Sequence, residues 1–122
     1  MVIGFKTQFV LPIIAGTKIH TIREDAKHRW RQGMTMHMAT GVRTKNYNCF
    51  KTTTCTGTRA INIDPVSRKI YIICNGYEFH YFTDEGKETL ALNDGFDSIE
   101  DFWKWFDKPF HGKIIYWTSR KY

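Results

Sequence analysis

The sequence predicts an α+β fold in which antiparallel strands curl into a small β-barrel flanked by two to three helices. Two observations lead to this prediction. Short apolar segments separated by turn residues occupy positions 34–82. Large apolar residues then recur at helical spacing from Ile99 to Phe106. A length of 122 residues with 42% hydrophobic residues fits one packed core, so residues 1–122 are expected to form a single domain.

The first helix is predicted over Gln8–Ala15. Thr7 is expected to cap its start. Gly16 is expected to end it, because glycine tolerates the left-handed conformation in which many helices end. Pro12 lies inside this range and removes a helical hydrogen bond unless it lies in the first turn. The helix is therefore expected to be short or to begin late.

Strand patterns occur on both sides of this helix and through the middle of the chain. Residues 64–67 are typical of a turn, and Asn75-Gly76 is typical of a two-residue hairpin turn. Basic loops are expected at 25–33 and 41–48. The predicted strands are Val2–Phe5, a short strand or extended loop from Ile19 to Ile22, 34–39, 49–63, Lys69–Cys74, Tyr77–Phe82 and Lys113–Thr118.

Two helices are predicted before the last strand. The first covers Asp84–Leu92. The second follows Ser98, which together with Asp101 resembles a capping box, and its apolar residues lie on one face. Pro109 and Gly112 are expected to end it.

The charge distribution is uneven along a chain whose net charge is +6. Residues 1–82 hold twelve Lys/Arg against four Asp/Glu, whereas residues 83–107 hold two against eight. This separation favours a positive face that attracts phosphate-bearing ligands, although a solvated basic surface would give the same pattern. No apolar run approaches the ~20 residues of a membrane span. The N-terminus lacks a signal-peptide layout, so a cytoplasmic location is expected.

The cysteines and histidines do not predict a metal centre. Three cysteines at unrelated spacing argue against a disulfide framework, and no Cys-x-x-Cys or His-x-x-x-His pair occurs. We therefore assign neither a metal nor a cofactor. Cys49 and Cys74 are expected to be small core residues. The five scattered histidines are interpreted as surface or core residues rather than ligands.

A short segment after the first predicted helix combines Lys18, Thr21 and Arg23. In an extended chain Thr21 and Arg23 share one face, and the long side chain of Lys18 can reach the same place. A threonine hydroxyl becomes a nucleophile only beside a base, such as a lysine whose pKa is lowered. Arg23 can supply a cation or bind a phosphate or carbonyl, and a carboxylate must orient the lysine. The spacing is equally compatible with Lys18, Thr21 and Arg23 being ordinary residues on the surface of a strand.

Three stretches resemble the ASCH domain, the activating-signal-cointegrator homology family of the PUA-like superfamily. The first is Ala-Gly-x-Lys-x-x-Thr-Ile-Arg at 15–23. The second is Asp-Gly-Phe-x-Ser-x-x-Asp-Phe at 94–102. The third is Gly-x-x-x-x-Tyr-Trp at 112–117. The resemblance spans nearly the whole chain and implies a PUA-like β-barrel flanked by helices, with a cleft beside the first stretch and RNA or nucleotide ligands.

One branch of the family is similar to amidohydrolases that deacylate N4-acetylcytidine. The resemblance implies that Thr21 attacks the amide carbonyl and Lys18 assists proton transfer. The family's glutamate falls near Asp94, whose carboxylate reaches one methylene less far. Glu85 and Glu88 are weaker candidates for this role. Other family members are proposed ribonucleases or simple binders.

Further ligand contacts are predicted from the basic segments. The Trp30 indole can stack on a base while the neighbouring arginines contact phosphates. Alternatively, Trp30 closes the barrel and the cations are solvated. The predicted binding residues are Lys6, Gln8, Arg23, Arg29, Trp30, Arg43, Lys45 and Tyr47.

Three functions remain open from the sequence. The first is binding of RNA or a modified nucleotide in a cleft around Lys18, Thr21 and Arg23. The second is amidohydrolysis of an acylated cytosine nucleoside, with Thr21 as nucleophile, Lys18 as base and Asp94 as the carboxylate. The third is sequestration of a small nucleotide without chemistry. The expected partner is thus RNA, a nucleotide or a nucleoside.

Overall fold

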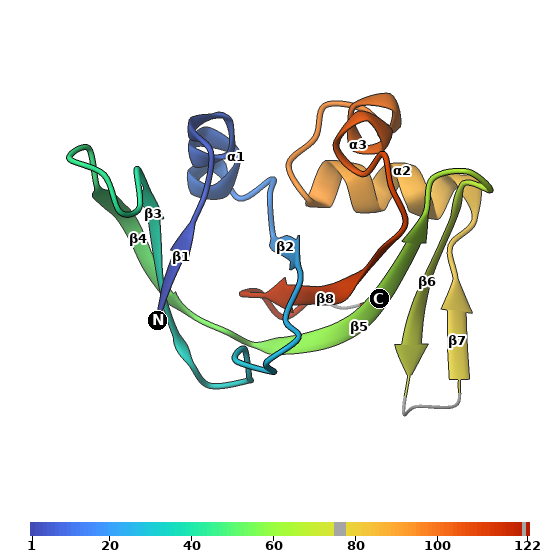
Figure 1. The fold of residues 1–122 in the computed structure, drawn as a ribbon, viewed down its shortest axis with the longest axis horizontal. Helices are drawn as coiled ribbons and strands as arrows, with labels where there is room; N and C mark the ends of the chain where they lie inside the picture. The colour runs from blue at the N-terminus through green and yellow to red at the C-terminus, as the bar shows by residue number, and fades with distance from the viewer. Residues whose placement is uncertain (75–77, 121) are drawn as a thin grey trace.

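The structure is a computed structural model that describes residues 1–74, 78–120 and 122. Its α+β chain forms two sheets and three α-helices, with the helices on the side toward which the curved wall of strands opens (Figure 1). The elements are β1 (Val2–Gly4), the 3-10 helix η1 (Thr7–Phe9), α1 (Val10–Ala15), β2 (His20–Arg23), β3 (Thr35–Thr40), β4 (Asn48–Thr54), β5 (Gly57–Asp64), β6 (Lys69–Cys74), β7 (Glu78–Tyr81), α2 (Asp84–Asn93), α3 (Ile99–Trp105) and β8 (Phe110–Tyr116).

The strands are divided between a three-stranded and a five-stranded sheet. Their orders are β1-β3-β4 and β2-β8-β5-β6-β7. All neighbours are antiparallel except β1 and β3, so the expectation of antiparallel strands throughout is wrong for this pair. The long connection through α1 and β2 explains the exception, because parallel strands need a crossover. A closed barrel stays a prediction.

The strand predicted over 49–63 is two strands, β4 and β5. Its break lies where neighbouring residues bond to different sheets. Cys55 N–H donates to Met34 O at 2.7 Å, beside β3, and Thr56 N–H donates to Tyr116 O at 2.9 Å, in β8. The chain therefore passes from one sheet to the other at this point, and the threonine-rich sequence that continues across it concealed the transition.

The first helix confirms the prediction of a late start. α1 begins at Val10, so Pro12 lies in its first turn. Thr7 does not cap it. Thr7 begins η1, and no side-chain hydrogen bond caps either helix start. Gly16 ends α1 with a φ of 83°.

The C-terminal helices are close to their predictions, with a different ending. Ser98 Oγ accepts the N–H of Asp101 at 3.2 Å, which confirms the predicted cap of α3. However, α3 ends at Trp105, and β8 begins at Phe110 rather than Lys113. Gly112 lies inside β8 instead of ending a helix. A Cβ there would overlap with Arg23 O, so glycine permits the close approach of β2.

The core lies between the wall of strands and the helices, and it includes Trp30 and Cys55. Cys49 is exposed, so its predicted burial is wrong. The reason is that β4 presents this face to solvent. The Cys74 side chain and the Asn75-Gly76 turn lie outside the described residues. In the part of the chain that is described, no helix is long and apolar enough to cross a membrane.

Candidate ligand-binding cleft

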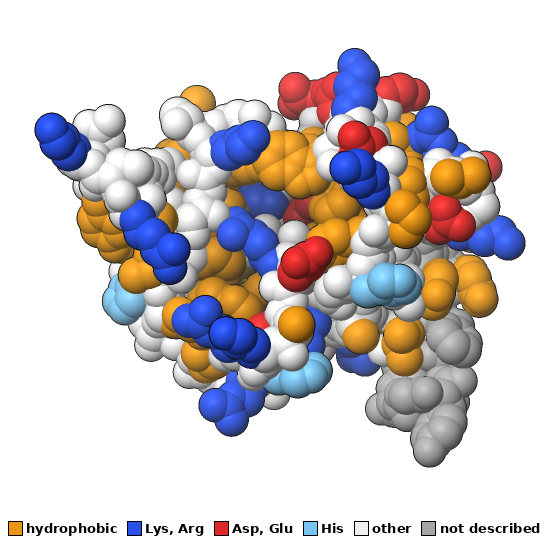
Figure 2. Space-filling view, viewed as in Figure 1, with side chains coloured by type: hydrophobic (Ala, Val, Ile, Leu, Met, Phe, Trp, Pro, Cys, Tyr) orange, Lys and Arg blue, Asp and Glu red, His pale blue; other side chains and the backbone are white. Residues whose placement is uncertain are grey.

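A cleft of about 290 Å³ lies between β1, β2 and the α2–α3 region. The surface is hollowed between α1 and the α2–α3 region, with charged side chains at the base of the hollow (Figure 2). Aromatic rings from η1, α3 and the segments that flank them form much of the cleft wall. The lining residues are Gly4, Phe5, Lys6, Phe9, Lys18, Thr21, Ile22, Arg23, Asp94, Phe96, Trp105 and Phe106.

A buried ion pair between Lys18 and Asp94 lies at the base of the cleft. Lys18 Nζ donates to Asp94 Oδ1 at 3.1 Å and to the Asp94 carbonyl oxygen at 2.5 Å. The two residues are only 2% and 3% exposed. Burial lowers the pKa of Lys18, the charge and hydrogen bond of Asp94 oppose this shift, and Arg23 adds a smaller lowering. The Asp94 carboxylate therefore reaches Lys18, although the aspartate side chain is one methylene shorter than the glutamate implied by the resemblance.

The ends of two helices place this pair. Asp94 is the C-cap of α2, and Gly95 follows in the left-handed conformation with a φ of 93°. The N–H groups of Gly95 and Phe96 donate to Leu92 O and Ala91 O, a pattern in which glycine is strongly preferred. On the other side, Lys18 follows the end of α1 and donates its N–H to Pro12 O, and Ile19 N–H donates to Asn93 O. The two turns and the bond between Ile19 and Asn93 together bring residues 76 positions apart into contact.

Thr21 and Arg23 lie on the same face of β2, as predicted, and both line the cleft. Arg23 Nε donates to Thr21 Oγ1 at 3.2 Å, and Arg23 Nη2 donates to Gly4 O. The guanidinium lies 4.8 Å from the centre of the Phe5 ring. Burial lowers the pKa of Arg23, and the charge of Asp94 opposes this shift. Lys18 lines the same cavity in spite of its opposite parity, because it precedes β2 rather than belonging to it.

His20 is a site residue that the sequence interpretation missed. Its ring is fully buried, with Nδ1 at 3.2 Å from Asp94 Oδ1 and Nε2 at 2.7 Å from Tyr122 Oη. Asn93 Nδ2 donates to the same Tyr122 oxygen at 2.9 Å. Burial lowers the pKa of His20, and Asp94 opposes this shift. Period-2 alternation places His20 on the face opposite Thr21, and only the position of Asp94 reveals its contact.

The other predicted binding residues are not all brought to the cleft. Lys6 lines it, with Nζ 4.8 Å from the centre of the Trp105 ring. Gln8 lines a separate cavity of about 320 Å³ beside α3. The indole of Trp30 is buried in the core at 8% exposure, which removes its faces from stacking and corrects that prediction. Four predicted residues lie on exposed loops outside the cleft lining: Arg29, Arg43, Lys45 and Tyr47. The exposed Glu85 and Glu88 also lie outside it.

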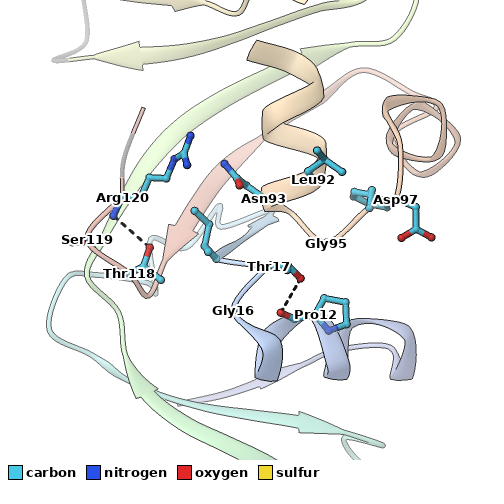
Figure 3. A pocket seen from close by; sticks show the side chains of 12 residues that line it. Pro12, Gly16, Thr17, Leu92, Asn93, Gly95, Asp97, Thr118, Ser119 and Arg120 are labelled. Carbon is cyan, nitrogen blue, oxygen red and sulfur yellow. Dashed lines mark hydrogen bonds between the residues drawn. The ribbon is translucent and has the colours of Figure 1, made fainter. Parts of the chain in front are cut away.

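A larger cavity of about 630 Å³ lies on the other side of the segments that hold the ion pair. Thr17, Asn93 and Gly95 line it, whereas the alternating residues Lys18 and Asp94 line the cleft. The side chain of Arg120 also lies along this cavity (Figure 3). We place the functional site in the smaller cleft because the buried charged groups converge there.

Comparisons with protein-family models, with curated proteins and with solved structures found no match to this chain. The candidate site therefore depends on its own geometry. Among residues 1–74, 78–120 and 122, no group of three or more His, Cys, Asp or Glu side chains is placed to hold a metal ion.

Replacing Gly95 by alanine should disturb the cleft, and Gly16→Ala is a matched control. Both glycines have a positive φ, so each alanine should cost about 1–2 kcal/mol of stability. A Cβ at Gly95 would lie 2.8 Å from Lys18 Cδ and 3.1 Å from Phe9 Cδ1, whereas nothing lies within 4 Å of a Cβ at Gly16. Chemical denaturation should show a larger loss of stability in Gly95→Ala because of this overlap, and the NMR signals of the Lys18 side chain should move only in Gly95→Ala. Equal movement in both variants would contradict this account.

Proposed function

We propose that this chain is an ASCH-type, PUA-like domain whose cleft binds one base-sized unit of RNA or a modified nucleotide. The observation that supports this function most strongly is the convergence of Lys18, Thr21, Arg23 and Asp94 on one aromatic-lined cavity. The resemblance to the family implied such a cleft beside residues 15–23. A PUA-like barrel is part of the same proposal.

The size and lining of the cleft support a single base or nucleoside as the ligand. A volume of about 290 Å³ lies at the lower end of the roughly 300–1,000 Å³ typical of small-molecule sites. The Trp105 ring lines the cleft and is 42% exposed, so it offers apolar contact to a planar base. Lys6 and Arg23 offer N–H donors to a carbonyl or phosphate oxygen. A nucleic acid would have to present one unstacked base to this cleft.

The exposed basic loops support RNA rather than a free nucleotide as the larger ligand. Arg29, Arg43 and Lys45 are exposed and lie outside the cleft lining, so they offer cations to the phosphates of a longer nucleic acid. Each phosphate contact in single-stranded RNA should add about −0.7 to the slope of log affinity against log salt. RNA as the partner and the cytoplasm as the location stay predictions.

Binding should depend on the cleft for a nucleoside and on both regions for RNA. Calorimetric titration with cytidine, N4-acetylcytidine and a short single-stranded RNA measures this. Lys18→Met should reduce affinity for every cleft ligand at least tenfold. The control Lys45→Met should leave nucleoside affinity unchanged and lower only the affinity and salt slope for RNA.

Nucleoside affinity that falls equally in Lys18→Met and Lys45→Met would contradict the assignment of the cleft. The same conclusion would follow if none of the three probes bound to the unaltered protein.

A second candidate, amidohydrolysis, is favoured by one specific contact. Asp94 reaches Lys18 Nζ at 3.1 Å, so the shorter carboxylate can orient the lysine. In the proposed reaction, Lys18 first gives up the proton of its ion pair with Asp94 and becomes a free amine. Thr21 Oγ1 then bonds to the amide carbon while its proton passes to this amine. The C–N bond then breaks, the amine leaves with a proton, and water hydrolyses the resulting ester to free the acid. Arg23 Nε, which donates to Thr21 Oγ1, stabilises negative charge on that oxygen.

Thr21→Val should separate turnover from binding. It keeps the shape of the side chain and removes the hydroxyl, so hydrolysis of N4-acetylcytidine should fall by at least a hundredfold while its affinity changes less than about threefold. Thr21→Ser retains a hydroxyl and should keep measurable activity. The conversion to cytidine is followed by absorbance, and affinity by calorimetry.

Undiminished hydrolysis in Thr21→Val would contradict this mechanism. Tight binding by the unaltered protein without turnover would instead favour the third function, sequestration of a small nucleotide.

A further inference from the structure

The two ring nitrogens of His20 have different partners, and both partners are part of one chain of hydrogen bonds. Nδ1 lies 3.2 Å from Asp94 Oδ1, and Nε2 lies 2.7 Å from Tyr122 Oη. Asn93 Nδ2 donates to the same Tyr122 oxygen at 2.9 Å. The His20 ring is 0% exposed, so bulk water does not contact it in the structure.

In this series of hydrogen bonds, the donors all point in one direction. An ionised Asp94 carboxylate can only accept a hydrogen bond, so His20 Nδ1 donates to Oδ1. Tyr122 Oη accepts from Asn93 Nδ2 and can donate its own proton to Nε2. Nε2 is then an acceptor, and the single ring proton resides on Nδ1, where it is donated to the Asp94 carboxylate. The ring is neutral in this arrangement, and every member has a partner.

Asp94 receives both buried donors on the same atom. Lys18 Nζ and His20 Nδ1 each contact Oδ1, at 3.1 and 3.2 Å. Among the described residues, no hydrogen bond reaches Asp94 Oδ2, and Asp94 lines the cleft. Fixing one oxygen from two sides therefore leaves the other free to accept a hydrogen bond from a ligand.

We propose that His20 is a positioning residue, which as the Nδ1–H tautomer fixes Asp94 so that one carboxylate oxygen pairs with Lys18 and the other faces the ligand. Tyr122 and Asn93 hold the ring in turn. This inference rests on the proposed function of the cleft, because it assigns His20 an effect on ligand binding or turnover without contact with the ligand.

Two amide variants distinguish positioning from simple packing. Asparagine places an N–H close to the Nδ1 position and can still donate to Asp94. Glutamine places its amide close to the Nε2 position and cannot donate to Asp94 in the same geometry. With N4-acetylcytidine as the probe, His20→Asn should retain affinity and turnover within about threefold of the unaltered protein. In His20→Gln, affinity or turnover should fall at least tenfold, with a melting temperature similar to that of His20→Asn.

Equal losses in the two variants would show that His20 only packs, and undiminished binding and turnover in His20→Gln would show that it does not position Asp94. Either result overturns the inference.

A ligand-free measurement separates this inference from the function of the cleft. Nitrogen-15 NMR of the histidine-labelled protein should show Nδ1 protonated and Nε2 unprotonated at neutral pH. Tyr122→Phe removes the donor to Nε2 but keeps its ring, and it should shift the Nε2 signal most. A proton on Nε2 would overturn the inference whether or not nucleosides bind. If the protein shows the expected tautomer but binds no nucleoside, the proposed function is contradicted instead.

Discussion

The pairing of a buried lysine with a buried aspartate is the constraint on which the cleft depends. Removing either charge from water is costly, and their attraction offsets that cost only with good geometry and further hydrogen bonds. Lys18 therefore bonds both the carboxylate and the carbonyl of Asp94, and His20 bonds the same carboxylate. The ends of α1 and α2 must meet for these contacts to form. The turn at Asp94 and Gly95 that ends α2, the approach of β2 to β8 and the aromatic rings around Lys18 surround the place where these contacts form.

Most elements could be predicted from local sequence because their signals are local. Gly16 and Pro12 fixed the length of α1, and Ser98 fixed the start of α3. The errors arose where contacts between elements distant in the sequence determine where a strand or helix begins or ends. The threonine-rich sequence continues across the change of sheet at Cys55, so one strand was predicted instead of two. Gly112 resembled a helix stop, although it is required where β2 lies against β8.

The candidate site could be predicted in part, because its residues come from two short stretches. The spacing of Lys18, Thr21 and Arg23 placed them near one another, and the Asp-Gly turn supplied the carboxylate. Neither spacing nor composition shows that Asp94 can reach Lys18, since that depends on how two helix ends meet. His20 escaped prediction for the same reason. Trp30 was misassigned because a tryptophan between arginines has the same local pattern in a binding loop and in a core.

The most direct test is the pKa of Lys18, measured by NMR titration of its side chain in the unaltered protein and in Asp94→Asn. The Lys18→Met variant identifies the signal by its absence. Burial lowers this pKa below the ordinary 10.5, and Asp94 opposes the shift, so removing the carboxylate's charge should lower it further. The lysine pKa should therefore be highest in free lysine, lower for Lys18 in the unaltered protein and lowest for Lys18 in Asp94→Asn. An ordinary pKa in the unaltered protein, or one that Asp94→Asn leaves unchanged, would contradict it.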